Sequence, residues 1–409
     1  MLKIKKLELS NFRGIDHLTL DFQEQVNIII GDNGSGKSAI LDCLAIMLSP
    51  LFQELYIIKP FFIDQDITNG KAETHNIISV YSDNLDKEIE WHLTKNRRGQ
   101  ATTNFEISEK ELEKIESENP PLIIHYPVNR AVFDIPVNIR TEDIFIREAA
   151  YEVAYYQVIR GKLTDFKIFF QWFRYCEDIE NEIRLDDHKH RDRQLEAVRK
   201  ATERLLPGFA ELRVRRSPLR MTVQKDDEEL IVDQLSDGEK CLLALVGDLA
   251  WRLAILNDKR SDPLEGSAVV LIDEVDLHLH PAWQRKIVPA LTRTFPNCQF
   301  VLTTHSPQIL SHVRPENIFG LRRVNNRVEM FQPEAAYGLD SNRILEDVMG
   351  VSERPRLIKE ELSELFLSIH EGKLDEAKKK MTDLMQNIGY DPELVKAGTI
   401  IRRKEIIGR

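Results

Sequence analysis

Eight residues near the N-terminus have the types and spacing that bind nucleotide phosphates. The run GDNGSGKS occupies residues 31–38, between an apolar run that ends at Ile30 and a stretch with helical spacing. Its glycines let backbone N–H groups point at phosphate oxygens, and a helix N-terminus adds partial positive charge. We expect Lys37 to reach the β and γ phosphates of ATP and the Ser38 hydroxyl to bind Mg²⁺. The predicted nucleotide-binding residues of this loop are Asn33, Gly34, Ser35, Gly36, Lys37, Ser38 and Ala39.

An apolar run in the second half of the chain ends in two carboxylates. Residues 268–272 are all apolar, and Asp273 and Glu274 follow them directly. Such a run predicts a buried strand that carries both side chains at its carboxyl end. We expect Asp273 to hold Mg²⁺ through water and Glu274 to polarise the water that attacks ATP. Many strands end in acidic residues, so this pattern alone is weak evidence. It predicts a catalytic site because a phosphate loop is present on the same chain.

A serine-containing segment could bind a second anion. Ser236, Gly238 and Glu239 lie just before a stretch with helical spacing at residues 241–256. A serine hydroxyl and a glycine that open a helix make an anion site. Because the chain already has a phosphate loop, we expect this segment to cap the γ-phosphate bound by a neighbouring chain. An ordinary helix N-cap is the alternative.

A histidine follows another apolar run. Residues 300–302 are apolar, and two threonines and His305 come next. At this place His305 could sense the γ-phosphate and orient the attacking water, which makes it a candidate catalytic residue with Lys37 and Glu274. A structural histidine at a strand end is the alternative. A zinc site that combines His305 with His278 and His280 is disfavoured, because tetrahedral sites use better spaced ligands.

The elements that must position these residues fall into four stretches. Residues 1–140 contain many short strands, which predict an antiparallel sheet, and one helix that ends before Pro50. Residues 141–206 have no proline and predict a helical insertion, in which the aromatic run at 169–173 forms helix core or a protein interface. Within residues 207–332, strands are predicted at 212–214 and 219–223, and helix and strand then alternate as in a parallel α/β core. Residues 333–409 have helical apolar spacing and predict a C-terminal tail.

Composition excludes several classes of protein. The 409-residue chain is 42% hydrophobic and 30% charged, and its formal net charge is −11. This acidity counts against a protein that coats DNA, although basic clusters at 95–98, 213–220 and 402–404 could meet phosphates. No apolar run reaches the length of a membrane helix, and the first residues lack the pattern of a signal peptide. Four scattered cysteines suit the reducing cytoplasm, where we expect the protein.

The order of these motifs resembles a known family. The phosphate loop, a Leu-Ser-x-Gly-Glu signature at 235–239, the acidic strand and the histidine look like an ABC-type ATPase of the SMC, RecF and OLD-like branch. The stretches 272–281, 303–307 and 337–342 are similar to the compact "AAA family" ATPases of anti-phage defence, such as those of Septu systems and retrons. The resemblance covers residues 1–50 and 207–409 well and the middle only loosely.

The resemblance implies a fold and a set of ligands. The fold would be α/β: a P-loop NTPase of ABC type with a parallel core sheet, an antiparallel β subdomain, a helical insertion and a helical tail. The ligands would be ATP and Mg²⁺, with two nucleotides held between the phosphate loops and signatures of a head-to-tail homodimer, or of a higher oligomer of such dimers. Asp276 would lie in a loop that communicates across that interface. Arg13, in the Asn-Phe-Arg-Gly segment at 11–14, would lie near the nucleotide.

Two positions depart from the family pattern. Asp237 occupies a signature position where the wider family usually has glycine, and it places a negative charge near the γ-phosphate. The glutamine of the family's Q-loop is not obvious, because Gln65 and the segment 126–130 both qualify and neither is assigned. Slow or partner-gated hydrolysis follows as a hypothesis.

The leading hypothesis is an ATPase switch that dimerises on ATP and regulates a separate effector in prokaryotic anti-phage defence. The effector would be a separate chain, because the residues after about 330 have helical spacing and not that of a nuclease domain. The resemblance implies that this chain is an HNH-type nuclease or a retron component. A RecF-like repair ATPase that binds DNA directly is the alternative. The protein would thus bind nucleic acid directly or through its partner, and we expect no membrane to be involved. A transporter's ATP-binding subunit and a nucleotide-locked scaffold without turnover are further alternatives.

Overall fold

The computed structural model describes residues 1–52, 61–105, 107–117, 122–128, 166–325 and 327–407. The chain divides into two compact units, Met1–Ser341 and Asn342–Arg409. The first unit contains the sheets and every residue that the sequence singles out for nucleotide chemistry. The second unit is made of helices.

A six-stranded sheet forms the centre of the first unit. Its strand order is β14-β13-β3-β12-β11-β7, and all its neighbours pair in parallel except β14, which is antiparallel to β13. Buried, largely apolar runs form three of the four interior strands, β3, β12 and β11, as expected where both faces of a parallel sheet are covered. The strands are β3 (Val26–Gly31), β7 (Leu122–Tyr126), β11 (Ala268–Ile272), β12 (Cys298–Thr303), β13 (Ile318–Val324) and β14 (Arg327–Phe331).

A five-stranded antiparallel sheet, in the order β2-β1-β4-β5-β6, confirms the predicted β subdomain. Its strands are β1 (Leu2–Phe12), β2 (Ile15–Asp21), β4 (Glu73–Ser82), β5 (Lys87–Asn96) and β6 (Ala101–Asn104). Helix α1 (Lys37–Leu48) contacts strands of both sheets. Its last turn is fixed by the Trp91 indole, which donates a hydrogen bond to the carbonyl of Met47 at 2.8 Å. The phosphate-loop helix is thus held between the two sheets.

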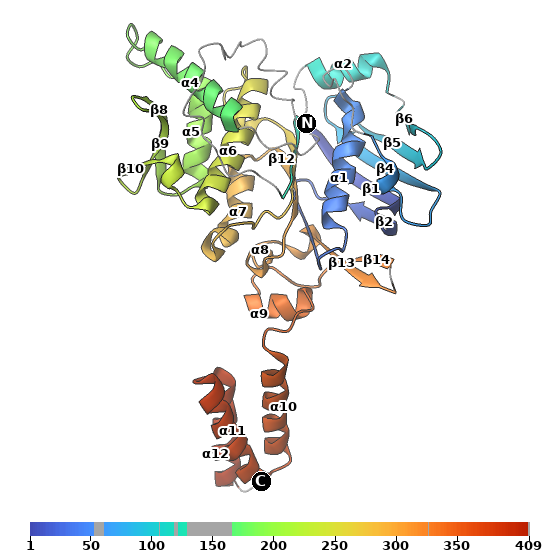
Figure 1. Ribbon diagram of the computed structural model, residues 1–409, viewed down its shortest axis with the longest axis vertical. Helices are drawn as coiled ribbons and strands as arrows, with labels where there is room; N and C mark the ends of the chain where they lie inside the picture. The colour runs from blue at the N-terminus through green and yellow to red at the C-terminus, as the bar shows by residue number, and fades with distance from the viewer. Residues whose placement is uncertain (53–60, 106, 118–121, 129–165, 326, 408–409) are drawn as a thin grey trace. The chain divides into compact units, whose positions relative to one another are not determined.

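Helices cover the other side of the central sheet, where α5, α6 and α7 gather in Figure 1. They are α4 (Phe166–Ile183), α5 (Arg193–Leu205), α6 (Asp237–Leu256), α7 (Pro281–Thr294) and the short α8 (Pro307–Leu310). Phe169, Phe170, Trp172 and Phe173 are buried, and the rings of Trp172 and Trp251 lie 5.8 Å apart. The prediction of helix core for this aromatic run is confirmed. Residues 141–165 of the predicted insertion lie outside the described residues.

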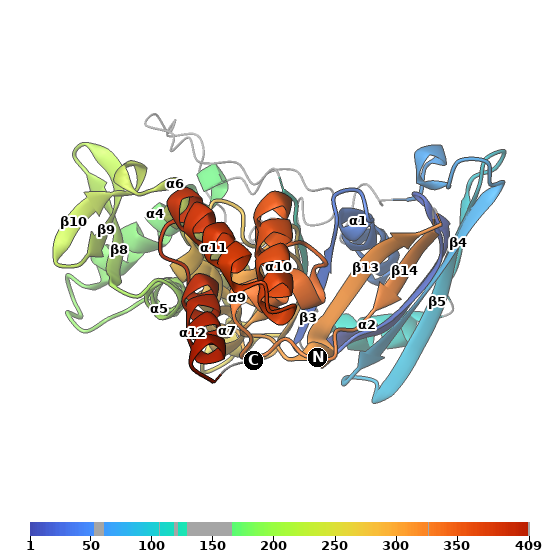
Figure 2. The same cartoon turned by 90° about the horizontal axis from the view of Figure 1, so that it is seen from below.

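A third sheet contains two strands that were predicted and one that was not. Strands β8 (Phe209–Arg216), β9 (Leu219–Lys225) and β10 (Glu228–Ile231) pair antiparallel in the order β10-β9-β8. The strands predicted at 212–214 and 219–223 lie within β8 and β9, whereas β10 and the antiparallel sheet itself were not predicted. Asp226 and Asp227 adopt positive φ angles of 46° and 68° and make the tight turn between β9 and β10. This sheet and the five-stranded sheet lie at opposite ends of the first unit (Figure 2). Helix α2 (Glu109–Ser117) was also not predicted.

The second unit is a three-helix assembly with its own core. After α9 (Ser341–Arg343) and a π-helical turn (Ile344–Val348) come α10 (Arg356–His370), α11 (Leu374–Ile388) and α12 (Pro392–Ile407). Leu365, Ile369, Leu384 and Ile401 are among the residues buried between the helices. Leu357, which the helical spacing placed with this core, is instead exposed. In the described residues, no helix combines the length and apolar character needed to cross a membrane.

Candidate nucleotide site

The phosphate loop joins β3 to α1 at the carboxyl edge of the central sheet. Gly34 and Gly36 have φ angles of 77° and 106°, in the left-handed region that glycine tolerates. Gly36 caps α1 without any side-chain hydrogen bond, so the first N–H groups of the helix remain for an anion. The Lys37 ammonium folds back over the loop and donates to the carbonyls of Gly31 at 2.8 Å and Asp32 at 3.0 Å.

The two predicted carboxylate residues follow β11 at the same edge. Asp273 is buried, and the hydroxyl of Thr303 on β12 donates a hydrogen bond to it. The same hydroxyl accepts from the backbone N–H of Glu274 at 2.7 Å, while Glu274 adopts a positive φ of 47°. Thr303 therefore orients Asp273 and fixes the turn that carries Glu274.

The carboxylates and the phosphate-loop lysine act on one another electrostatically. Burial lowers the pKa of Lys37, and the charges of Asp273 and Glu274, with smaller contributions from Asp32 and Asp276, oppose that shift. An ammonium that is partly desolvated and faces carboxylates is a ready binding partner for phosphate. The structure therefore brings Lys37, Asp273 and Glu274 together at one site.

His305 lies on the loop after β12, at the same carboxyl edge, and its side chain is half-buried. The loop is fixed on both sides of the histidine. The Thr304 hydroxyl donates to Asp276 at 2.6 Å, and the Ser306 hydroxyl donates to Gln284 on α7 at 2.7 Å. The histidine loop is thereby joined to the segment that begins at Asp276.

The signature segment begins α6, in a different part of the first unit. Ser236 is the N-cap, and its hydroxyl donates to the Glu239 carboxylate at 2.8 Å while accepting from the Glu239 N–H at 3.4 Å. Lys225 donates to the same carboxylate at 2.7 Å. Burial alone would raise the pKa of Glu239, but the hydrogen bonds from Lys225 and Ser236 outweigh it and the pKa is lowered. The segment is thus a true helix cap, and Ser236 remains exposed.

Gly238 makes the closest contact of this segment. A Cβ at Gly238 would lie 2.5 Å from the carbonyl oxygen of His278, so only glycine fits there. The signature and the segment after Asp276 together line a cavity of about 640 Å³, which is formed by residues 236–239, 278–280, 282 and 283. Among the described residues, no hydrogen bond or ion pair joins the signature to the phosphate loop of the same chain.

His280 is the N-cap residue of helix α7. Its Nδ1 accepts a hydrogen bond from the N–H of Ala282 at 3.2 Å and caps α7, which requires that this nitrogen carry no proton. His278 is exposed. Within the residues that the structure describes, no three histidine, cysteine, aspartate or glutamate side chains are arranged to hold a metal ion.

Arg13 lies between two carboxylates that sequence reasoning missed. Its Nε donates to Asp66 at 2.6 Å and its Nη1 donates to Asp42. Asp42 follows Ser38 by four residues, a spacing that places both on one helix face and could have identified it. Of the two candidate Q-loop regions, Gln65 is exposed beside Asp66, and the segment after Tyr126 leaves β7 next to β11. Residues 129 and 130 lie outside the described residues.

The loop residues fit a nucleotide. The Ser35 hydroxyl is buried without a hydrogen-bond partner, and a Cβ at Gly31 would fall 2.5 Å from the carbonyl oxygen of Leu321. A tightly packed loop with a free helix N-terminus, a lysine and an unsatisfied hydroxyl suits phosphate oxygens. Carboxylate and hydroxyl oxygens from Asp273 and Ser38 suit Mg²⁺.

This fold, with a phosphate loop, an acidic strand end and a separate signature helix, defines an ABC-type ATPase head. Residues 26–311 match the family model described as "AAA domain, putative AbiEii toxin, Type IV TA system". The chain belongs to this family.

Several relatives match most of the chain, among them a retron ATPase and a Septu protein. The chain is 31% identical to the retron Ec83 probable ATPase of Escherichia coli, over 96% of this chain and 85% of that protein. It is 25% identical to the Septu protein PtuA of Bacillus thuringiensis, over 94% of each. An SMC head bound to the C-winged helix domain of ScpA shares the fold, with a TM-score of 0.51 and 16% identity over 81% of this chain and 98% of that one. The predicted family and fold class are confirmed.

Proposed function

We propose that the protein is an ATP-driven switch that closes as a head-to-tail dimer and regulates a separate effector in anti-phage defence. The observation that carries this proposal is the separation of two half-sites in one chain. The phosphate loop ends in a helix N-terminus without a side-chain cap, and the exposed Ser236 begins α6 with no bond to that loop. Two copies related head to tail would complete two sites.

Each residue of the site would have one task in hydrolysis. Lys37 and the α1 N-terminus would bind the phosphates, while Ser38 and Asp273 would hold Mg²⁺, whose charge would offset that of the phosphates. Glu274 accepts a proton from the attacking water, His305 orients that water, and the γ-phosphorus–bridging-oxygen bond breaks to give ADP and phosphate. Ser236 of the second copy caps the γ-phosphate. The placement of Lys37, Asp273 and Glu274 at one sheet edge supports these roles.

The defence role and the effector rest on the relatives. Their names, a retron ATPase and a Septu protein, support a function in systems of that kind. The effector would be a separate chain of HNH-nuclease type or a retron component. Co-purification of the protein with the product of a neighbouring gene, in the presence and absence of ATP, tests this part of the proposal.

A complementation experiment tests the head-to-tail site. Lys37→Ala destroys the phosphate loop and Ser236→Ala destroys the signature, so each variant alone should be inactive. A mixed dimer restores one intact site out of two, and random pairing predicts about a quarter of wild-type ATPase activity. No recovery on mixing would contradict the shared site. Glu274→Gln should keep ATP binding and accumulate the closed dimer, which size-exclusion chromatography with ATP detects.

Direct binding of nucleic acid is a second candidate function, and one observation favours it. Residues 184–220 carry eleven arginines and lysines against six aspartates and glutamates, in a chain with net charge −11. Many of these arginines line a cavity of about 590 Å³ between α4, α5 and β8. Guanidinium groups bind phosphate oxygens in pairs, so a local excess of arginine suits a phosphate backbone.

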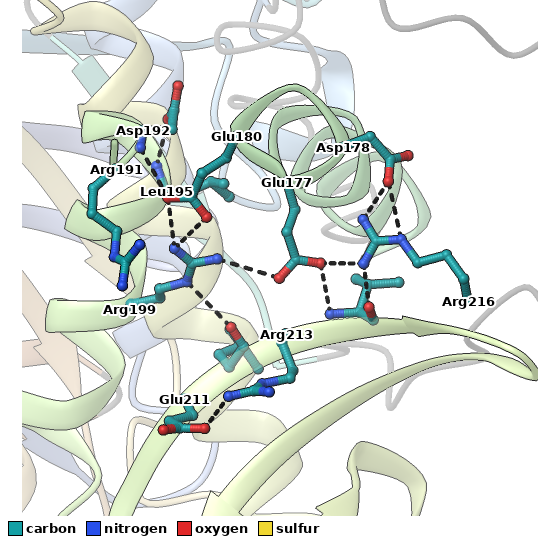
Figure 3. Close-up of polar contacts among 12 residues, drawn as sticks. Glu177, Asp178, Glu180, Arg191, Asp192, Leu195, Arg199, Glu211, Arg213 and Arg216 are labelled. Carbon is teal, nitrogen blue, oxygen red and sulfur yellow. Dashed lines mark hydrogen bonds and ion pairs between the residues drawn. The ribbon is translucent and has the colours of Figure 1, made fainter. Parts of the chain in front are cut away.

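Part of this arginine cluster is already neutralised. Figure 3 shows the buried Glu177 carboxylate between the guanidinium groups of Arg199 and Arg216. Arg199 also donates two hydrogen bonds to the buried Glu180, at 3.1 and 3.0 Å. Arg184 and Arg191 have no carboxylate partner among the described residues, so they are the cations that remain for a ligand.

Salt dependence of DNA binding tests this second function. Replacing Arg184 and Arg191 with alanine should weaken binding and reduce the slope of log affinity against log salt by about 2, one for each lost phosphate contact. Arg356→Ala, at an exposed position of the second unit, is the matched control. If the double variant kept the wild-type slope of log affinity against log salt, the cavity lined by these arginines would not be the DNA-binding surface.

A further inference from the structure

The turn between β1 and β2 holds Arg13 in one place. Arg13 adopts a positive φ of 42°, and its backbone N–H donates to the carbonyl of Asp66 at 2.9 Å. The next residue, Gly14, donates to the hydroxyl of Thr68 at 3.0 Å. The backbone of the turn is therefore fixed to the segment 66–68, and the two carboxylates determine only where the guanidinium group lies.

The two carboxylates differ in what they are attached to. Asp66 is buried, and its second oxygen accepts the N–H of Ile63 at 2.8 Å, so it belongs to the same rigid turn region. Asp42 lies on α1, one helical turn after Ser38 and on the same helix face. Asp42 is therefore the residue that ties Arg13 to the phosphate-loop helix.

Arg13 keeps donors for a further anion. A guanidinium group has five N–H bonds, and the contacts with Asp42 and Asp66 use one at Nε and one at Nη1. Its side chain is 34% exposed. Burial alone would lower the pKa of Arg13, but the hydrogen bonds to Asp42 and Asp66 outweigh it and the pKa is raised. The group stays charged with three donors unused by these carboxylates.

A second neighbour limits how Asp42 can move. His125 on β7 is buried, and its Nδ1 lies 3.8 Å from the other carboxylate oxygen of Asp42. Burial lowers the pKa of His125 and so disfavours its charged form. Arg13 is therefore the cation that Asp42 holds, and His125 closes the opposite side of the carboxylate.

We propose that Asp42, one helical turn after Ser38 on α1, is a positioning residue that holds the Arg13 guanidinium group against the phosphate-loop helix, so that Asp42 affects ATP hydrolysis through Arg13. This inference rests on the proposed function, because it assumes that ATP is hydrolysed at this loop and that Arg13 lies near its phosphates. An arginine near the phosphates acts most strongly on the charge that develops during phosphoryl transfer. Loss of its position should therefore lower kcat more than it raises KM.

A double-mutant cycle tests the inference. Arg13→Ala and Asp42→Asn should each lower kcat about tenfold, and the double variant should be no slower than Arg13→Ala alone if Asp42 acts through Arg13 and not through its other neighbour, His125. Asp42→Glu keeps the charge and should retain more activity than Asp42→Asn. The inference would be overturned if the effects of the two substitutions on kcat multiplied in the double variant. It would also be overturned if Asp42→Asn kept the wild-type kcat.

Two further measurements separate the outcomes. Asp347→Asn breaks an exposed arginine–aspartate pair in the second unit and should leave kcat unchanged. The same cycle is measured on ATP binding by calorimetry, where any loss of affinity caused by Asp42→Asn should be absent in the Arg13→Ala background, and an equal loss in both backgrounds would overturn the inference. If wild-type protein binds ATP without hydrolysing it, the proposed function fails, and this binding cycle still decides the role of Asp42.

Discussion

The Thr303 hydroxyl donates to the carboxylate of Asp273 across neighbouring strands and also accepts the backbone N–H of Glu274 at 2.7 Å. One side chain on β12 thus orients the proposed metal ligand and fixes the turn that carries the proposed general base. The relationship explains why a threonine, and not only an acidic pair, matters at this edge of the sheet.

Removal of this hydroxyl should damage both hydrolysis and stability. Thr303→Val keeps the shape of the side chain but removes the hydrogen bond that Thr303 donates to the buried Asp273, which should cost about 1–3 kcal/mol of unfolding free energy. Displacement of a metal ligand should reduce Mg²⁺ affinity or activity by about 10- to 100-fold. Magnesium titrations of ATPase activity and thermal unfolding measure the two effects.

The chain offers a matched control for that experiment. Thr294 is fully buried, and its hydroxyl has no hydrogen-bond partner. Thr294→Val removes a buried polar group that makes no bond, so stability should stay equal or rise while the ATPase activity remains that of the wild type. Equal losses of activity in the two valine variants would show that Thr303 acts only through packing.

Much of the fold could be predicted because its signals are local. The apolar runs of β3, β11 and β12, and the glycines and lysine of the phosphate loop, are contiguous in sequence. The partners of Arg13 could not be found this way, since Asp66 is 53 residues distant along the chain. Likewise, nothing near Glu274 in sequence indicates that its backbone is fixed by Thr303. Strands β8 and β9 could be predicted, but β10 could not, because it has only four residues and two of them are glutamates.

The contact of Gly238 with His278 predicts a variant that separates nucleotide binding from dimerisation. In Gly238→Ala the new Cβ would meet the His278 carbonyl oxygen at 2.5 Å, so the signature helix or the facing loop must move. ATP binding at the phosphate loop should persist, while the ATP-dependent dimer seen by light scattering should be lost.

Gly398→Ala controls for the general effect of adding a methyl group. Gly398 lies in α12, where a Cβ would make an ordinary contact of 3.6 Å with the Met381 sulfur. Alanine in a helix interior is favoured over glycine by about 0.5–1 kcal/mol, so this variant should dimerise normally and be slightly more stable. A Gly238→Ala protein that dimerises as well as this control would show that the contact has no part in the interface.

The second unit should unfold more readily when its own core is damaged. Leu365 is fully buried among α10, α11 and α12, whereas Leu367 on the same helix is 57% exposed. Leu365→Ala in the full chain should cost about 2–5 kcal/mol, and Leu367→Ala should cost little. Hydrogen exchange should show faster opening of α10 to α12 in the first variant alone. Equal exchange in both would mean that Leu365 is not part of a cooperative core.

The lowered pKa of Glu239 predicts how the signature cap depends on pH. The pKa of Glu239 is lower in the folded protein than in the unfolded chain, where it is near 4.5. The ionised carboxylate therefore stabilises the fold at pH values above 4.5, and this stabilisation is lost as the pH falls through the lower, folded-state pKa. Lys225→Met removes one of the interactions that lower this pKa. The variant should therefore be about 1 kcal/mol less stable than wild type at pH 7, and this difference should shrink below about pH 4.

Lys240→Met, which loses only a 3.7 Å contact with Asp237, is the control. Thermal unfolding at pH 7 and pH 3.5 measures the difference, and a deficit of the same size at both values would assign the effect of Lys225 to packing instead of charge.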